Sequence, residues 1–157
     1  MSITLVGAAW LHLGATIVVV GYFAVLTLFV LPVLGRALPG ALLGTTVASI
    51  ERRALPVVVG SFVVFLATGI YMTGGDARYG GPGSIDSPWA TIVLVKHGVI
   101  VVMLALGAWV DAVAVRAGAS TDDGGRASAI RRFTLGSGVL TALGLLVLLL
   151  TAAAQAS

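Results

Sequence analysis

Two histidines, His12 and His97, are the residues of this chain best suited to bind a metal or a cofactor. They are its only histidines, and each lies inside an apolar segment of membrane-spanning length. An ionisable side chain in such a segment is costly, so it usually faces the interior of a helix bundle and marks a functional site. Because neutral imidazole is also the commonest metal ligand, the pair predicts a metal or cofactor site within a membrane bundle.

An apolar slot between two facing imidazoles suits a b-type haem, and helix bundles commonly build cofactor sites in this way. Lys96 and Arg78 are then the expected partners of the haem propionates, and Thr16 or a backbone carbonyl is expected to fix a histidine tautomer. Ligation by both histidines leaves no open coordination position and favours electron transfer. The leading interpretation is therefore a haem b electron-transfer protein, or a subunit of a redox complex, with His12 and His97 as axial ligands.

Two other interpretations of the histidines stay open. Met72 ends the second apolar segment, and together with His12 and His97 it would suit copper, which takes imidazole and soft thioether ligands. Met72 is expected nearer the surface than the histidines, however, and the plainest role of Met72 and Met103 is packing. In the third interpretation the chain is a cofactor-free structural or assembly subunit, its histidines make interhelical hydrogen bonds, and Lys96 extends to the headgroups.

The composition places these residues in a lipid environment. Hydrophobic residues make up 59% of the chain and charged residues 10%, whereas a soluble domain carries about 25% charged residues. Residues 3–35, 54–75 and 133–157 carry no charge, and Lys96 is the only charge in 87–110. These apolar runs are continuous and do not alternate, so they predict helices and not a barrel.

The expected fold is all-α, a single transmembrane four-helix domain over residues 1–157. The helices are expected at about 3–34, 53–73, 88–115 and 131–153, with a connector at 35–51 and a glycine-rich loop at 74–87. Ser87 is the expected N-cap of the third helix. The first segment has no basic start and is too long for a secretory signal, so it is expected to stay as the first helix.

The distribution of arginine predicts the orientation of the bundle. Seven arginines lie in the first and third connections, and only Arg78 lies in the second. The positive-inside rule then places the two basic connections in the cytoplasm and both termini outside. His12 and His97 each follow their outer helix end by about 15 Å. Asp111 is expected to face cytoplasmic water or to pair with Arg116.

Several classes of function are excluded or disfavoured by the sequence. The absence of cysteine excludes disulfides, thiolate metal sites and iron–sulfur clusters. Nothing in the sequence resembles a catalytic triad. The glycine-rich segment 74–83 is not a nucleotide cradle, because it has no Lys-Ser/Thr pair and does not follow a strand. The net charge of +3 comes from arginines that are explained by topology, so nucleic acid is not an expected partner.

Short motifs in the first three helices resemble those of copper-resistance D (CopD)-like membrane proteins and, more distantly, HemJ-type protoporphyrinogen oxidases. The motifs are Trp10-Leu11-His12, Arg53-Ala54-Leu55-Pro56, Thr68-Gly69-Ile70-Tyr71, Ser87-Pro88-Trp89-Ala90 and Leu94-Val95-Lys96-His97. The resemblance covers roughly residues 5–115, and the fourth helix is generic.

The two resemblances imply different functions. Similarity to CopD-like proteins implies copper handling or uptake at the inner or plasma membrane. Similarity to the HemJ type implies haem b binding through a first-helix histidine and a third-helix lysine, at the positions of His12 and Lys96, and it adds porphyrinogen oxidation as a fourth, weaker interpretation. His97 is extra relative to that pattern. The expected partners are the lipid bilayer and other membrane or redox subunits, or a second copy of the chain.

Overall fold

The computed structural model describes residues 2–157 and consists of four long helical stretches. The first stretch comprises α1 (Ile3–Val25), a π-helical turn η1 (Leu26–Val30) and α2 (Leu31–Ala37). The others are α3 (Gly40–Gly74), α4 (Pro88–Ala119) and α5 (Asp123–Ala156). Each stretch is long and apolar enough to cross a membrane, and residues 2–157 contain no strand. The expected all-α fold with four membrane helices is confirmed.

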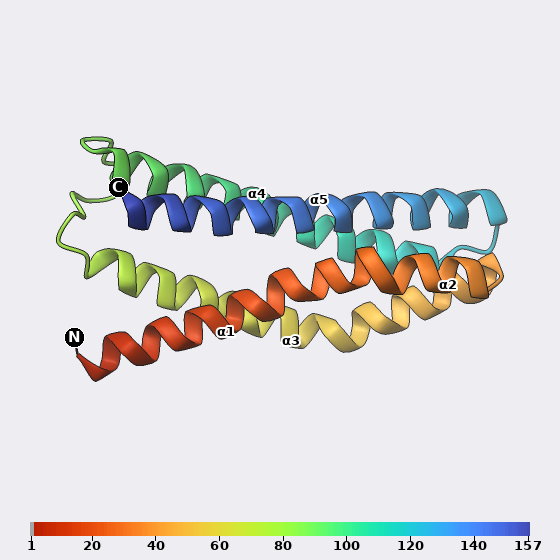
Figure 1. The fold of residues 1–157 in the computed structure, drawn as a ribbon. Coiled ribbons are helices and arrows are strands. Elements are labelled where there is room, and N and C mark those ends of the chain that lie inside the picture. Colours follow the sequence, from red (N-terminus) through yellow and green to blue (C-terminus); the bar gives the residue numbers. More distant parts are fainter. Residues whose placement is uncertain (1) are drawn as a thin grey trace.

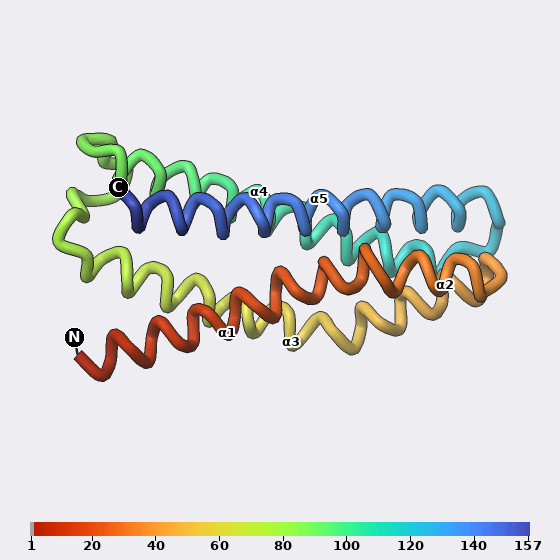
Figure 2. The backbone as a smooth tube through the Cα atoms, viewed as in Figure 1, coloured from red at the N-terminus to blue at the C-terminus, as the bar shows by residue number. Residues whose placement is uncertain are grey.

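The helices form a ring in which α1 and α4 are diagonal partners. α1 packs against α3 and α5, and α4 packs against the same two helices. Both chain ends and the loop at residues 75–87 lie at one end of the bundle, which we call the loop end (Figures 1 and 2). The connections before α3 and α5 lie at the opposite, basic end, where most arginines gather. The cytoplasmic location of the basic end stays a prediction.

Three helix boundaries at the basic end differ from the expectation. α3 begins at Gly40 and not near Arg53, α4 continues to Ala119, and α5 begins at Asp123 and not near Arg131. Charged residues there suggested loops, but a helix must be apolar only where it lies in hydrocarbon. Asp122 starts α5 early because its carboxylate accepts a hydrogen bond from the backbone N–H of Gly125 at 2.6 Å.

Two prolines lie in helical backbone that continues on both sides of them. Pro56 lies near the start of the helix expected at 53–73, but it lies inside α3 because that helix begins at Gly40. Pro32 does not end the first stretch, since it occupies one of the first positions of α2, directly after the π turn η1. Such local adjustments let a membrane helix tolerate a residue that lacks a backbone N–H.

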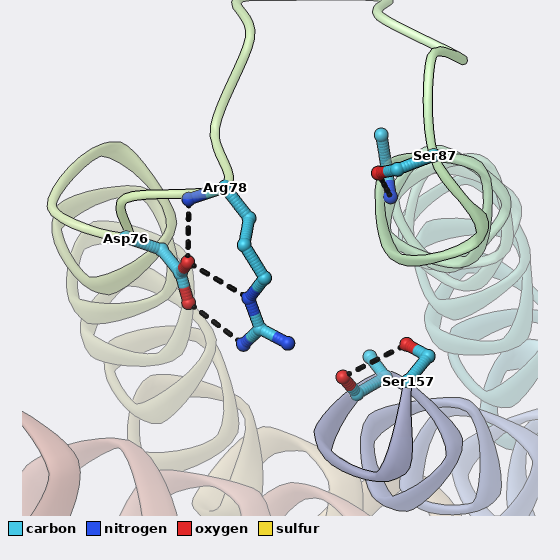
Figure 3. Close-up of polar contacts among 6 residues, drawn as sticks. Asp76, Arg78, Ser87 and Ser157 are labelled. Atoms are coloured by element: carbon cyan, nitrogen blue, oxygen red, sulfur yellow. Dashed lines mark hydrogen bonds and ion pairs between the residues drawn. The ribbon is translucent and has the colours of Figure 1, made fainter.

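The start of α4 has the predicted Ser87 N-cap, which fixes the positions of the residues that follow along the helix. The Ser87 hydroxyl accepts a hydrogen bond from the backbone N–H of Ala90 at 3.1 Å (Figure 3), and Pro88 occupies the first turn. Trp89, Val93 and Lys96 then recur at spacings of four and three residues along one face of α4.

Small residues bring α3 and α4 into close contact near the basic end. A Cβ atom added to Gly44 would lie 2.6 Å from the carbonyl oxygen of Ala117, and one added to Gly118 would lie 2.6 Å from the Cβ of Ala48. Small residues at such crossings let two backbones approach within a membrane. This contact therefore holds the basic end of the bundle together.

Gly44→Ala should destabilise the bundle, whereas Gly60→Ala in the same helix should not. The added methyl at position 44 meets backbone, and overpacking of this kind costs about 1–3 kcal/mol. At Gly60 nothing lies within 4 Å of the added atom, and alanine is the better helix former. Thermal unfolding of both variants in one detergent measures the difference, and equal midpoints would contradict the close α3–α4 contact.

Candidate functional site

A cavity of about 310 Å³ at the loop end is lined by all four membrane helices. We call it the His12 cavity. Its lining residues are Ala9, His12, Leu13 and Thr16 of α1; Phe65, Gly69, Met72 and Thr73 of α3; Asp76 and Arg78 of the following loop; Trp89, Val93 and Lys96 of α4; and Val147, Leu148, Thr151, Ala154 and Gln155 of α5. In every helix these residues recur three or four positions apart, so each helix presents one face to the cavity.

Hydrogen bonds to α3 fix the tautomer of His12. Its Nδ1 atom lies 3.1 Å from the carbonyl oxygen of Phe65 and 2.9 Å from the hydroxyl of Thr68. A carbonyl oxygen can only accept, so Nδ1 carries the hydrogen. The Thr68 hydroxyl donates to the Val64 carbonyl at 2.6 Å and is therefore free to accept from Nδ1. The Nε2 atom of His12 keeps its lone pair for a ligand.

Packing holds the His12 ring flat against α3. The ring stacks on Phe65 with the centroids 4.5 Å apart and an angle of 21° between the planes. Gly69 makes room for it, because an added Cβ there would lie 3.2 Å from the Cε1 atom of His12. Thr16 bonds to the backbone instead of the ring: its hydroxyl donates to the His12 carbonyl oxygen at 2.7 Å. Of the two expected partners, Thr16 or a backbone carbonyl, it is a carbonyl, that of Phe65, that holds the tautomer, and Thr68 is a second partner that was not predicted.

Met72 lines the same cavity as His12. It follows Phe65 and Gly69 on one face of α3, at spacings of four and three residues. The sequence suggested that Met72 lies at the surface, away from the depth of the histidines. Because the cavity extends from His12 to the loop end, its wall carries both an imidazole and a thioether.

An ion pair and an aromatic ring lie at the mouth of the cavity. The Nε and Nη2 atoms of Arg78 each donate to Asp76 at 3.0 Å, and the Arg78 guanidinium lies 4.9 Å from the centre of the Trp89 ring. Figure 3 shows the Arg78 side chain reaching into the space between the helix ends. These hydrogen bonds hold the pKa of the Asp76 carboxyl below its usual range and raise the pKa of Arg78. Trp89 is itself buried, with 7% of its surface exposed.

His97 lines a different cavity. This second cavity, of about 470 Å³, is lined mainly by the glycine-rich loop at residues 79–84 and by the neighbouring parts of α3 and α4. The Nδ1 atom of His97 donates to the carbonyl of Val93, in its own helix, at 2.6 Å. The structure therefore brings His12, Thr16, Met72, Lys96 and Arg78 to one cavity and leaves His97 outside it. Within residues 2–157, no three His, Asp or Glu side chains gather into a group that could hold a metal.

A buried carboxyl, that of Glu51, lies near the basic end and was not predicted from the sequence. Glu51 is 5% exposed and accepts a hydrogen bond from the Tyr22 hydroxyl at 2.6 Å. It lines a cavity of about 460 Å³ together with Arg52 and Asp111. Asp111 makes no ion pair with Arg116 in the described part of the chain, so of the two expected arrangements the one in which it faces cytoplasmic water stays a prediction. Glu51 was overlooked because residues 35–51 were expected to form a solvated connector.

Fold and site together define a multi-pass membrane protein with a mainly apolar cavity between its helices, into which a few polar and charged side chains are brought. The family model described as copper resistance protein D (CopD) matches residues 48–154, more than half of the chain, so the chain belongs to the CopD family. It is therefore a membrane protein related to copper resistance. No curated protein and no solved structure matches the chain.

The family match includes all the motifs except Trp10-Leu11-His12 and extends beyond them toward the C-terminus. It runs from α3 through α4 to α5 and so includes the fourth helix, which the sequence analysis treated as generic. Met72, Arg78 and Lys96 lie inside the matched region, whereas His12 lies outside it. The cavity thus combines family-matched helices with a histidine from α1.

Tyr22→Phe should destabilise the protein, because it leaves the buried Glu51 carboxyl without its hydrogen bond. The expected loss is about 1–3 kcal/mol, the cost of an unsatisfied buried polar group. Tyr71→Phe is the matched control, since Tyr71 is 54% exposed and its hydroxyl lies 3.5 Å from Thr4. Thermal unfolding of the three proteins measures the effect; no difference between the two variants would contradict a buried Tyr22–Glu51 bond.

Proposed function

We propose that the protein binds Cu(I) as cargo in the His12 cavity, with His12 Nε2 and the thioether of Met72 as ligands. The observation that carries this proposal is the fixed tautomer of His12. Both partners of Nδ1 lie on α3, so Nε2 is left as the ligand atom, and Met72 arises from the same face of that helix. Membership of the copper resistance protein D family supports copper as the metal.

The donor set suits Cu(I) better than harder metals. Imidazole binds copper, and soft thioether ligands select Cu(I), whereas magnesium, calcium and manganese prefer carboxylates and water. Among residues 2–157, Asp76 is the only carboxylate that lines the cavity, and it is held by Arg78. A ligating histidine typically donates its second ring N–H to a carbonyl, carboxylate or water, and the Phe65 carbonyl takes this role for His12.

Haem b is the less favoured occupant. A haem ligated by both histidines, as the sequence first suggested, needs His12 and His97 on the two sides of one cavity. They line different cavities, which share only Thr73, Trp89 and Val93. We therefore favour copper over a haem ligated by both histidines and over an electron-transfer role built on it. The HemJ-type pair, His12 and Lys96, does line one cavity, and there it is the family match that favours copper over porphyrinogen oxidation. Association with other membrane subunits or with a second copy stays a prediction.

Cu(I) affinity should fall by about 100-fold in His12→Ala, since the only nitrogen ligand of the cavity is lost; removing even a residue that merely supports a ligand costs 10–100-fold. Met72→Leu should also weaken binding strongly while keeping the packing volume. Thr68→Val should cost about tenfold, because it removes one of the two groups that hold the His12 tautomer. Competition with a Cu(I)-specific chelator, using purified protein in detergent, measures all three affinities.

His97→Ala and Met103→Leu are the matched controls for these variants. They remove the other histidine and a buried methionine outside the His12 cavity, so Cu(I) affinity should stay unchanged. An equal loss in His97→Ala would contradict the proposed ligand set. A haem b spectrum that disappears in both histidine variants would replace copper by haem as the occupant.

A further inference from the structure

Lys96 gives the His12 cavity a positive charge that no neighbouring carboxylate balances. It lies within the membrane-spanning helix α4 and lines the cavity. The ion pairs of residues 2–157 are Arg78–Asp76 and Arg126–Asp123, so Lys96 has no partner in the described chain. Asp76 is already held by Arg78 through both carboxylate oxygens.

The charges around the cavity therefore sum to a positive value. Asp76 and Arg78 cancel, His12 adds no negative charge in either of its protonation states, and Lys96 remains. An unbalanced charge within a membrane helix is costly, and such residues are usually paired or mark the path of a substrate. A bare cation would add to this positive charge, whereas a guest with a negative charge would balance it.

We infer that the His12 cavity takes an anionic guest, whose negative charge lies against Lys96. The inference rests on the proposed function in one respect: it makes the copper cargo an anionic Cu(I) complex, with its counter-ligand facing Lys96. His12 and Met72 then add to a two-coordinate Cu(I) anion that keeps both of its anionic ligands. The bound complex thus retains its single negative charge, no ligand is released, and no redox step is needed. The Nη1 atom of Arg78, which makes no bond to Asp76, is a further donor at the mouth of the cavity.

Quenching of Trp89 fluorescence tests the anion site without copper. Trp89 lines the cavity and lies on the same face of α4 as Lys96, about 10 Å along the helix. A background variant with Trp10→Phe and Trp109→Phe leaves Trp89 as the only tryptophan. Iodide is the anionic probe, and acrylamide is the neutral probe that reports the access of small molecules to the ring.

The ratio of iodide to acrylamide quenching should fall roughly tenfold in Lys96→Gln. This is the expected loss of local iodide concentration when one positive charge, about 10 Å from Trp89, is removed at an effective dielectric constant of about 20. Lys96→Arg should keep the ratio, and Arg36→Gln, which removes a charge at the basic end, should not change it. An unchanged ratio in Lys96→Gln would overturn the inference, because Lys96 would then extend to the headgroups. Using the ratio corrects for any change in the shape of the cavity.

Two further measurements separate the possible sources of the anion. Nanodiscs of phosphatidylcholine, with and without phosphatidylglycerol, compare a lipid phosphate with a small anion. If iodide quenching is lost only in nanodiscs that contain phosphatidylglycerol, a lipid headgroup occupies the site in place of iodide. That result would overturn the small-anion inference. The wild-type protein should also bind Cu(I) more tightly when it is supplied as dichlorocuprate than as the cationic acetonitrile complex, and Lys96→Gln should remove this preference.

These outcomes distinguish the inference from the function on which it rests. Failure to bind copper in either form would contradict the proposed function, and the iodide ratio would still decide whether the cavity holds an anion. Equal affinity of the wild type for both copper forms would overturn the anionic cargo.

Discussion

The hydrogen bonds from His12 Nδ1 to α3 are the interaction on which the site depends. Polar groups in a membrane interior must find partners within the protein, and His12 finds both of its partners on one neighbouring helix. These hydrogen bonds fix the tautomer of His12, hold its ring stacked on Phe65 and leave its Nε2 atom as the ligand atom. They also explain why α3 carries glycine at position 69, where a larger residue would meet the ring.

The buried polar groups at the two ends of the bundle differ in whether they have partners within the protein. At the basic end the Glu51 carboxyl is satisfied by Tyr22, and small residues press α3 against α4. At the loop end the helices leave a cavity, and Lys96 within it is not satisfied by any carboxylate of the described chain. A protein that only needed to be stable would have little reason to keep that charge, so we place function at the loop end.

Much of the fold could be predicted from the sequence, because continuous apolar runs and the Ser87 cap depend on local chemistry. The helix boundaries at the basic end could not, since charged residues such as Arg53 are compatible with both a loop and a helix that leaves the membrane. Three-residue and four-residue spacing could have placed Met72 with Gly69 and Phe65. The separation of His12 from His97 could not be predicted, because it depends on how α1 and α4 are rotated across the bundle.

X-ray absorption at the copper edge of the Cu(I)-loaded protein tests the central claim most directly. The account predicts a first coordination shell that contains one imidazole nitrogen from His12 and one thioether sulfur from Met72. The sulfur contribution should disappear in Met72→Leu, and the imidazole contribution should disappear in His12→Ala. A shell with two imidazoles and no sulfur, sensitive to His97→Ala, would contradict the account.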